Sequence, residues 1–241
     1  MPGERRLGIL ARLVGPTDSG METKRLCAVC VEVTGVTGAG IMLMSGDMPS
    51  GSVCTTSTVS ELIEKLQYEL GEGPSVDAHK KDRPVLEPDL ADPKVPRWLA
   101  FSGPAITAGV RAVFGFPLQV GAVRLGALSL YCDRVGPLTD DQHADALVMA
   151  DVAAQAVLVL QANAPLGTLA SELESGGDFQ YVVHQAAGMV AVQLDVNVAH
   201  AMIRMRGHAF AHDRRLADVA GDVVARVLHF DELDLDEGAS V

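Results

Sequence analysis

Apolar positions with helical spacing predict helices over residues 18–34, 61–70, 98–101 and 140–162. The face of the first helix consists of Leu26, Val29, Cys30 and Val33. The last helix is long, and the sequence "LTDDQ" before it has the residue order of a capping box. The expected caps and stops are Thr58 or Ser60 before the second helix, Gly71 after it, and Thr139 with Gln142 before the last.

Apolar runs between turn residues predict strands. One strand ends near Ser45, a turn occupies residues 46–51, and residues 52–57 return as the second strand of a hairpin. The runs "RAVFGFPLQV" and "RLGALSLYCD" predict two further strands joined at Gly121. Residues 71–93 carry several prolines and predict a loop. This order of elements indicates an α+β fold, an antiparallel sheet with helices packed on one face.

A glycine-rich stretch adds a family resemblance to this arrangement. The segment "ELGEGPSVDA", Glu69–Ala78, together with the order of elements, resembles the GAF domains of two-domain bacterial regulators over about residues 20–162. The resemblance implies a pocket between the sheet and its covering loops, often for a small ligand. Many relatives have a cysteine where this chain has Ser75, so thiol chemistry is not expected at that position.

Three short helices are predicted after a break rich in proline and glycine at residues 163–177. Asp178, Asn197 and Asp213 are expected to cap them. Each helix has an apolar face too narrow to be stable alone, so the helices must pack together as a bundle. The third has the clearest stripe, made of Leu216, Val219, Ala220, Val223, Val224 and Val227.

The bundle resembles an ANTAR domain, the RNA-binding module of bacterial transcription antiterminators, over Val183–Val224. The resemblance is carried by "QAAGMV", by Ala201, by "MR" followed by Ala209, and by "DRRLADVA", with the family's spacing kept. Two positions depart from the family pattern. Ala187 replaces a common lysine, and Gly207 within the second helix costs about 1 kcal/mol relative to alanine.

Arginine is concentrated in this bundle although the chain is acidic. The chain has 19 lysine and arginine residues against 31 aspartate and glutamate residues, a net charge of −12, which argues against broad coating of nucleic acid. Arginine can contact phosphate and stack on unpaired bases. The candidate RNA-binding residues are Arg204, Arg206, Arg214 and Arg215. Alternatively, Arg204 lies on a solvated face and Arg206 braces the bundle through Asp218 or Asp222.

Other chemistry in the bundle has simpler interpretations. Tyr181 and Phe210 are expected to fill the core, with base stacking as the alternative. His208 and His212 lie one helical turn apart, but no third ligand is evident, so no metal site is expected.

The cysteines do not indicate a catalytic or disulfide-based protein. Four cysteines are too few and too scattered for a disulfide scaffold. Cys27 and Cys30 form one C-x-x-C in apolar surroundings and are predicted to be core residues of a helix, with redox or metal sensing as the alternative. Some GAF domains reduce methionine sulfoxide with paired cysteines, but no such pairing can be argued here. We therefore expect no enzyme, no catalytic residues and no cofactor.

Assembly and location follow from the apolar pattern. The stripe of Leu147, Val148, Ala154, Val157 and Leu158 exceeds what one sheet face needs, which predicts a homodimer. No run approaches about 18 unbroken apolar residues, and Arg12 interrupts the N-terminal run, so neither a membrane span nor a signal peptide is expected. The predicted location is the cytoplasm.

These observations predict an RNA-binding transcription antiterminator. A GAF sensor domain would receive a small ligand or a partner protein and would control an ANTAR domain that binds paired RNA hairpins. The alternative is a dimeric ligand- or protein-binding regulator whose bundle no longer binds RNA. The predicted parts are an extension (1–19), the GAF-like domain (20–162), a linker (163–177), the ANTAR domain (178–229) and an acidic tail (230–241), which could compete with RNA for the arginines.

Overall fold

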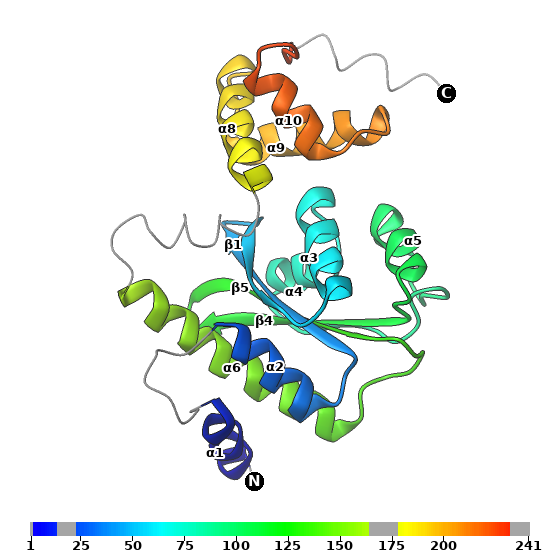
Figure 1. The fold of residues 1–241 in the computed structure, drawn as a ribbon, viewed down its shortest axis with the longest axis vertical. Helices are drawn as coiled ribbons and strands as arrows, with labels where there is room; N and C mark the ends of the chain where they lie inside the picture. The colour runs from blue at the N-terminus through cyan, green and yellow to red at the C-terminus, as the bar shows by residue number, and fades with distance from the viewer. Residues whose placement is uncertain (1, 14–22, 164–177, 232–241) are drawn as a thin grey trace. The chain divides into compact units, whose positions relative to one another are not determined.

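The computed structural model describes residues 2–13, 23–163 and 178–231, and the chain divides into two compact units (Figure 1). The first unit is Met1–Leu173 and the second is Glu174–Val241. Residues 164–177 of the predicted linker and residues 232–241 of the predicted acidic tail lie outside the described residues.

An antiparallel sheet forms the centre of the first unit. In the described residues it has five strands in the order β2-β1-β5-β4-β3. The strands are β1 Gly38–Ser45, β2 Met48–Thr55, β3 Val85–Glu87, β4 Ala112–Val120 and β5 Val123–Cys132. Strand β1 pairs with the central strand β5 in a register that matches Gly38 to Tyr131 and Leu43 to Gly126. The turn of the first hairpin is shorter than predicted, because Met48 already pairs with Ser45.

Helices cover both faces of the sheet, not one face as predicted (Figure 1). Helices α2 (Thr23–Thr34) and α6 (Asp140–Asn163) cover one face, and α3 (Thr58–Leu70), α4 (Pro74–Lys81) and α5 (Leu99–Thr107) cover the other. The physical reason is that both faces of the central strands are apolar. In β4, alternate side chains from Ala112 to Leu118 pack with α2 and α6, whereas Val113 packs on the opposite side.

Helix α4 occupies part of the predicted loop. Gly71 ends α3 in the left-handed conformation with φ 66°, and Gly73, with φ 130°, precedes α4. Pro74 is the first residue of α4, a position where a fixed φ and a missing N–H favour a helix. The glycines and the proline therefore separate two helices, and the loop prediction was wrong here.

Two predicted helix starts have different outcomes. Ser57, not Thr58, caps α3, and its side chain and that of Ser60 each accept a hydrogen bond from the other residue's backbone N–H. The capping box before α6 is confirmed: Thr139 N donates to Gln142 Oε1 at 2.9 Å and Gln142 N donates to Thr139 Oγ1 at 3.2 Å. Gln142 also donates to Thr34 O at 2.8 Å, which joins the start of α6 to the end of α2.

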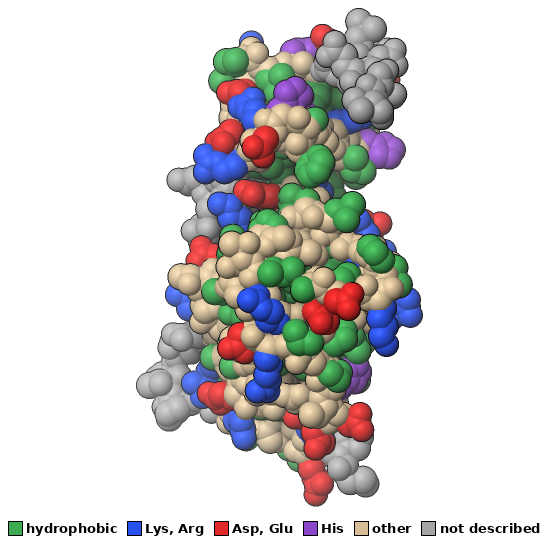
Figure 2. All heavy atoms as spheres, turned by 90° about the vertical axis from the view of Figure 1, so that its right-hand side faces the viewer, with side chains coloured by type: hydrophobic (Ala, Val, Ile, Leu, Met, Phe, Trp, Pro, Cys, Tyr) green, Lys and Arg blue, Asp and Glu red, His purple; other side chains and the backbone are tan. Residues whose placement is uncertain are grey.

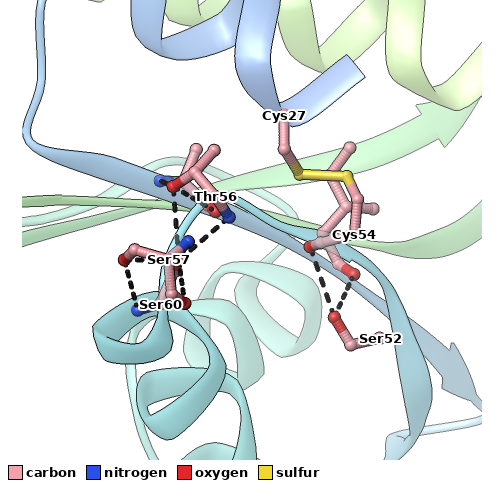
Figure 3. Close-up of a disulfide and its surroundings, with 8 residues drawn as sticks. Cys27, Ser52, Cys54, Thr56, Ser57 and Ser60 are labelled. Atoms are coloured by element: carbon pink, nitrogen blue, oxygen red, sulfur yellow. Dashed lines mark hydrogen bonds between the residues drawn. A yellow bond between two sulfur atoms is a disulfide. The ribbon is translucent and has the colours of Figure 1, made fainter. Parts of the chain in front are cut away.

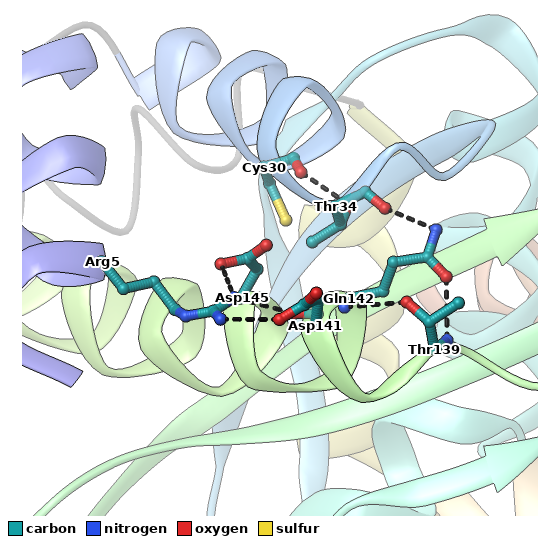
Figure 4. A network of polar contacts seen from close by, with 7 residues as sticks. All are labelled: Arg5, Cys30, Thr34, Thr139, Asp141, Gln142 and Asp145. Atoms are coloured by element: carbon teal, nitrogen blue, oxygen red, sulfur yellow. Dashed lines mark hydrogen bonds and ion pairs between the residues drawn. The ribbon is translucent and has the colours of Figure 1, made fainter. Parts of the chain in front are cut away.

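The N-terminal extension contains a helix, α1 (Pro2–Leu13), that packs on α2 and α6. Its buried residues Ile9 and Leu13 join the same core as those helices. Arg5 forms ion pairs with two carboxylates of α6 (Figure 4): its Nη2 atom lies 2.9 Å from Asp141 Oδ1, and its Nη1 atom lies 2.6 Å from Asp145 Oδ1. Helix α1 is thus fastened by both apolar and charged contacts.

Helix α6 is long and apolar enough to cross a membrane by length and composition alone, over Asp140–Leu160. No helix of this kind was predicted from the sequence. Its apolar residues from Ala146 to Val157 are mostly buried in the core beside the sheet, α1 and α2. Core packing therefore accounts for its composition, and such a single helix is weak evidence for a membrane span.

The second unit contains the three predicted helices: α8 (Asp178–Gln193), α9 (Val198–Ala211) and α10 (Leu216–Val224). Asn197 caps α9 as predicted and accepts a hydrogen bond from His200 N at 2.9 Å. Asp213 does not cap α10: it has φ 50°, and Arg215 is the residue that precedes the helix. The buried stripe of α10 comprises Leu216, Val219, Ala220 and Val223, whereas Val227 lies beyond the helix and is exposed.

Candidate functional site

The four candidate arginines lie on α9 and on the turn that follows it. Arg204 is exposed and Arg206 is half-buried on α9, on either side of the buried Met205. Arg214 and Arg215 stand in the turn before α10, both exposed. The structure therefore distributes the predicted cluster over one helix and the next turn.

Two of these arginines have carboxylate partners on α10. Arg214 Nη2 lies 2.6 Å from Asp222 Oδ2. Arg215 donates two hydrogen bonds to Asp218, from Nε at 2.8 Å and from Nη2 at 2.7 Å. Asp218 and Asp222 are also the carboxylates considered as partners of Arg206, so the same side of α10 holds Arg214 and Arg215. Because exposed ion pairs contribute only about 0–1 kcal/mol, a phosphate could replace either carboxylate at little cost.

Neither aromatic residue of the site fills the core. Phe210 on α9 is 72% exposed and Tyr181 on α8 is 58% exposed, so the core-filling prediction was wrong for both. The core is filled instead by small and aliphatic side chains such as Val183, Met205 and Val219. Ile203 and Val198 of α9 are also exposed, at 61% and 41%, so large apolar side chains of this helix face solvent.

Phe210 and Ile203 form part of a strip along α9, which we call the α9 strip: Ala199, Ile203, Gly207 and Phe210. Positions three and four apart share a helix face, and all four residues are exposed. At helical spacing, Arg206 borders the strip on one side and Arg204 on the other. Gly207 has open space where a Cβ would be, so the middle of the strip is flat.

The two departures from the ANTAR pattern have structural explanations. Ala187 on α8 is fully buried, so a side chain at this position does not point to solvent. Gly207 has no unusual backbone angle, and nothing lies within 4 Å of the Cβ that an alanine would add. Its cost is therefore one of helix propensity alone.

His208 and His212 stack on each other, with ring centroids 4.0 Å apart. Phe230 packs edge-on against His208, with the ring centroids separated by 5.3 Å. In the described residues, no group of three or more His, Cys, Asp or Glu side chains is placed to hold a metal ion. On the face drawn in Figure 2, basic and acidic side chains are interspersed and do not gather into a basic patch.

A second candidate site is a buried polar cluster in the first unit, between α3, α4 and the sheet. It comprises Glu64, Gln67, Ser75 and Ser129, none more than 3% exposed. Gln67 Nε2 donates to Ser129 Oγ at 2.9 Å, and Ser75 N donates to Gln67 Oε1 at 2.7 Å. The hydroxyl groups of Ser75 and Ser129 are also hydrogen-bonded to each other. Ser75, which occupies the usual cysteine position, is thus a member of this network.

Glu64 is the one acidic member of the polar cluster. Burial raises the pKa of its carboxyl group to about 8, and a hydrogen bond from Ser129 opposes the shift only in part. Its Oε2 atom is buried without a hydrogen-bond partner. A Cβ at Gly40 of β1 would lie 2.8 Å from Glu64 Cγ, so the glycine makes room for this side chain. The carboxyl group is therefore held neutral near pH 7.

This cluster was not predicted from the sequence, although the sequence contains a signal for it. Ser60, Glu64 and Gln67 recur at helical spacing on α3, and all three are buried. Three polar residues on the inward face of a helix indicate a polar contact with the sheet.

A disulfide joins Cys27 of α2 to Cys54 of β2 (Figure 3). The prediction that Cys27 is merely a core residue was therefore incomplete, and pairing of these cysteines was not foreseen. Cys30 and Cys132 are free and buried. Burial raises the pKa of the Cys30 thiol to about 12, which makes it a poor nucleophile.

Comparison with known proteins identifies the fold of the first unit. No family model and no curated protein sequence matches the chain. The GAF domain of a phosphoenolpyruvate-protein phosphotransferase from Coxiella burnetii aligns over 67% of this chain and 95% of its own, with a TM-score of 0.51 and 15% identity. The corresponding domain from Acinetobacter aligns over 67% and 96%, with a TM-score of 0.52 and 10% identity. About two thirds of the chain thus has the GAF-domain fold, as predicted, and the comparisons assign no family to the three C-terminal helices.

Proposed function

We propose that this protein is an RNA-binding transcription antiterminator, in which the GAF unit receives a signal and the C-terminal bundle binds paired RNA hairpins. The observation that carries the proposal is the α9 strip. Phe210 and Ile203 are exposed between Arg204 and Arg206, although a bundle without a partner gains from burying such side chains. RNA loops offer unpaired bases that stack on aromatic rings and phosphates that arginine binds.

The resemblance of Val183–Val224 to ANTAR domains supports the same proposal from the sequence. In the proposed complex, the aromatic ring of Phe210 stacks on a base of a hairpin loop, and Arg204 and Arg206 contact the flanking phosphates. Arg214 and Arg215 exchange their carboxylate partners for phosphate. The regulator is proposed to act in the cytoplasm, without catalysis and as a homodimer, so that two bundles bind two hairpins.

The proposed signal-receiving site is the buried polar cluster around Glu64. Its unpartnered Oε2 supports this assignment, because a ligand that donates a hydrogen bond would supply the missing partner.

A binding titration of the full chain with a two-hairpin RNA tests the proposal. Phe210→Ala should weaken binding by about 1–3 kcal/mol, the usual cost of a lost stacking contact. Val192→Ala is the control, since Val192 is an exposed apolar residue on α8 and not part of the α9 strip. A wild-type protein that binds no hairpin RNA even at low salt, or a Phe210→Ala variant equal to the control, would disprove the proposal.

A dimeric regulator without RNA binding is the second candidate. The observation in its favour is charge: in residues 178–231, acids outnumber arginines by one, and Arg214 and Arg215 are paired. In that case the α9 strip would contact a second copy of the chain. Phe210→Ala would then lower the molar mass in light scattering, and neither the wild type nor the variant would bind RNA.

A further inference from the structure

The Cys27–Cys54 disulfide fastens an edge strand to a core helix. Strand β2 lies at the edge of the sheet, and its pairing with β1 is irregular between Ile41 and Met42 and again between Leu43 and Met44. The first irregularity directly follows the pair of Ile41 with Cys54. Since an irregular ladder holds a strand less firmly, the covalent bond to α2 is a main attachment of β2 at this point.

The helix that carries Cys27 also contacts α6. Leu26, Val29 and Cys30 of α2 are buried in the same apolar core as the residues of α6. The hydrogen bond from Gln142 to Thr34 connects the two helices at their other ends (Figure 4). A shift of α2 at Cys27 would therefore alter its packing against α6, the last helix of the GAF unit.

We propose that Cys27–Cys54 is a thiol–disulfide exchange site, opened by a low-molecular-weight thiol, through which redox state controls the packing of β2 and α2 beside α6. This inference goes beyond the proposed function and does not depend on RNA binding. Disulfides persist in oxidising compartments, whereas glutathione-type thiols reduce them in the cytosol. In the cytoplasm, the location predicted from the sequence, the ratio of thiol to disulfide in this pool would determine the fraction of the protein in which the bond is closed.

The exchange is balanced with two thiols. A thiolate attacks the Sγ atom of Cys54, a residue that is 6% exposed whereas Cys27 is fully buried. It forms a mixed disulfide there and displaces Cys27 as a thiolate, which takes up a proton. A second thiolate attacks the outer sulfur of the mixed disulfide and releases Cys54, which is also protonated. The protein gains two electrons and two protons, and the two small thiols leave as their disulfide. A small-molecule disulfide drives the reverse reaction.

The two free cysteines serve as internal controls. Cys30 lies one helical turn from Cys27 and is fully buried, as Cys27 is, and Cys132 lies on β5. Neither is joined to another cysteine. Cys132→Ser should therefore leave the exchange unchanged.

Glutathione redox buffers with the full chain test the proposal. Thiol alkylation followed by mass spectrometry should show two alkylated cysteines after denaturation of the oxidised protein and four after reduction. The transition should occur in the native protein, below its unfolding temperature, and equally in Cys132→Ser. Hydrogen exchange of the reduced form should be faster in β2, and also in α2 and α6, while α4, which packs on β4 and β5, is unchanged. Reduction should lower the melting temperature by roughly 5–10 °C, because the crosslink no longer restricts the unfolded chain.

Two results would overturn the inference. One is a disulfide that opens only when the protein unfolds, which would make it a structural crosslink. The other is reduction in the native state with hydrogen exchange in α2 and α6 unchanged. The variant Cys54→Ser cannot form the disulfide and so mimics the reduced protein. It should reproduce the hydrogen-exchange pattern of the reduced wild type, and glutathione should not change that pattern.

Discussion

Arg214 reaches from the turn before α10 to Asp222, eight residues later, with its Nη2 atom 2.6 Å from Oδ2. One turn earlier on the same helix, Asp218 binds Arg215 in the same way. These contacts hold both guanidinium groups against α10. They also mean that the charge of each arginine is shared between a carboxylate and any approaching phosphate.

Asp222→Asn should therefore tighten RNA binding. Removing the carboxylate leaves Arg214 available to phosphate, and we expect a gain of roughly twofold to fivefold at low salt that shrinks as salt rises. Asp195→Asn is the matched control, because Asp195 is exposed and lies in the turn after α8. Binding titrations at two salt concentrations measure the effect, and equal affinities of the two variants would contradict it.

Arg214→Ala and Arg215→Ala should reduce the salt dependence of RNA binding by somewhat under one unit per arginine. Their melting temperatures should hardly change, because the lost ion pairs are exposed. A variant with lowered stability and unchanged RNA affinity would show that the arginine braces the bundle instead. Circular-dichroism melts of the same samples distinguish the two results.

Glu64 should make the protein less stable as the pH rises. Its pKa is about 8 when folded and about 4.5 when unfolded, so between these values the folded state keeps a proton that the unfolded state releases. The free energy of unfolding should fall by up to about 1.4 kcal/mol per pH unit in this window. Glu64→Gln should flatten the profile between pH 5 and 8. Urea unfolding at several pH values measures it, with Glu61→Gln, an exposed site on the same helix, as control.

Gly207→Ala should stabilise the second unit by about 0.5–1 kcal/mol. Alanine has the higher helix propensity, and nothing lies within 4 Å of the added Cβ. The change also adds a methyl group to the middle of the α9 strip. Reduced RNA affinity together with a raised melting temperature would support a close approach of RNA at this point, whereas a lowered melting temperature would contradict the structure.

Two parts of the C-terminal segment should have different effects, Phe230 on stability and residues 232–241 on RNA affinity. Phe230 is buried, and its N–H donates to Gln193 Oε1 at 3.1 Å, so Phe230→Ala should cost about 3–5 kcal/mol. Removal of residues 232–241 should leave the melting temperature unchanged and raise RNA affinity at low salt, since the removed segment is acidic. Unchanged affinity of the truncated protein would reject competition between the tail and RNA.

Local signals predicted the elements better than the contacts between them. Asn197 and the pair Thr139 and Gln142 cap their helices as predicted, because capping depends on residues within one turn. Asp213 fails as a cap because the chain takes a left-handed turn there and α10 begins only after Arg215.

Long-range partners could not be predicted in the same way. Nothing in helical or strand periodicity states that Cys27 and Cys54 meet, because their approach depends on how α2 packs on the sheet edge. The polar cluster was accessible only in part: the spacing of Ser60, Glu64 and Gln67 marks a polar face, but the partner Ser129 lies in a strand far along the chain. The exposure of Phe210 likewise depends on which face of α9 its neighbours cover.

The position of β1 between β2 and β5 has a consequence for the growing chain on the ribosome. The strand carries the apolar run "GIMLM" and needs β5 as its second neighbour, yet β5 is made only after α3, α4, β3, α5 and β4. Until then the β1–β2 hairpin presents an open, apolar edge to every other nascent chain nearby. Synthesis of this protein should therefore depend on chaperones that bind extended apolar segments, and pauses in translation before β5 should increase aggregation.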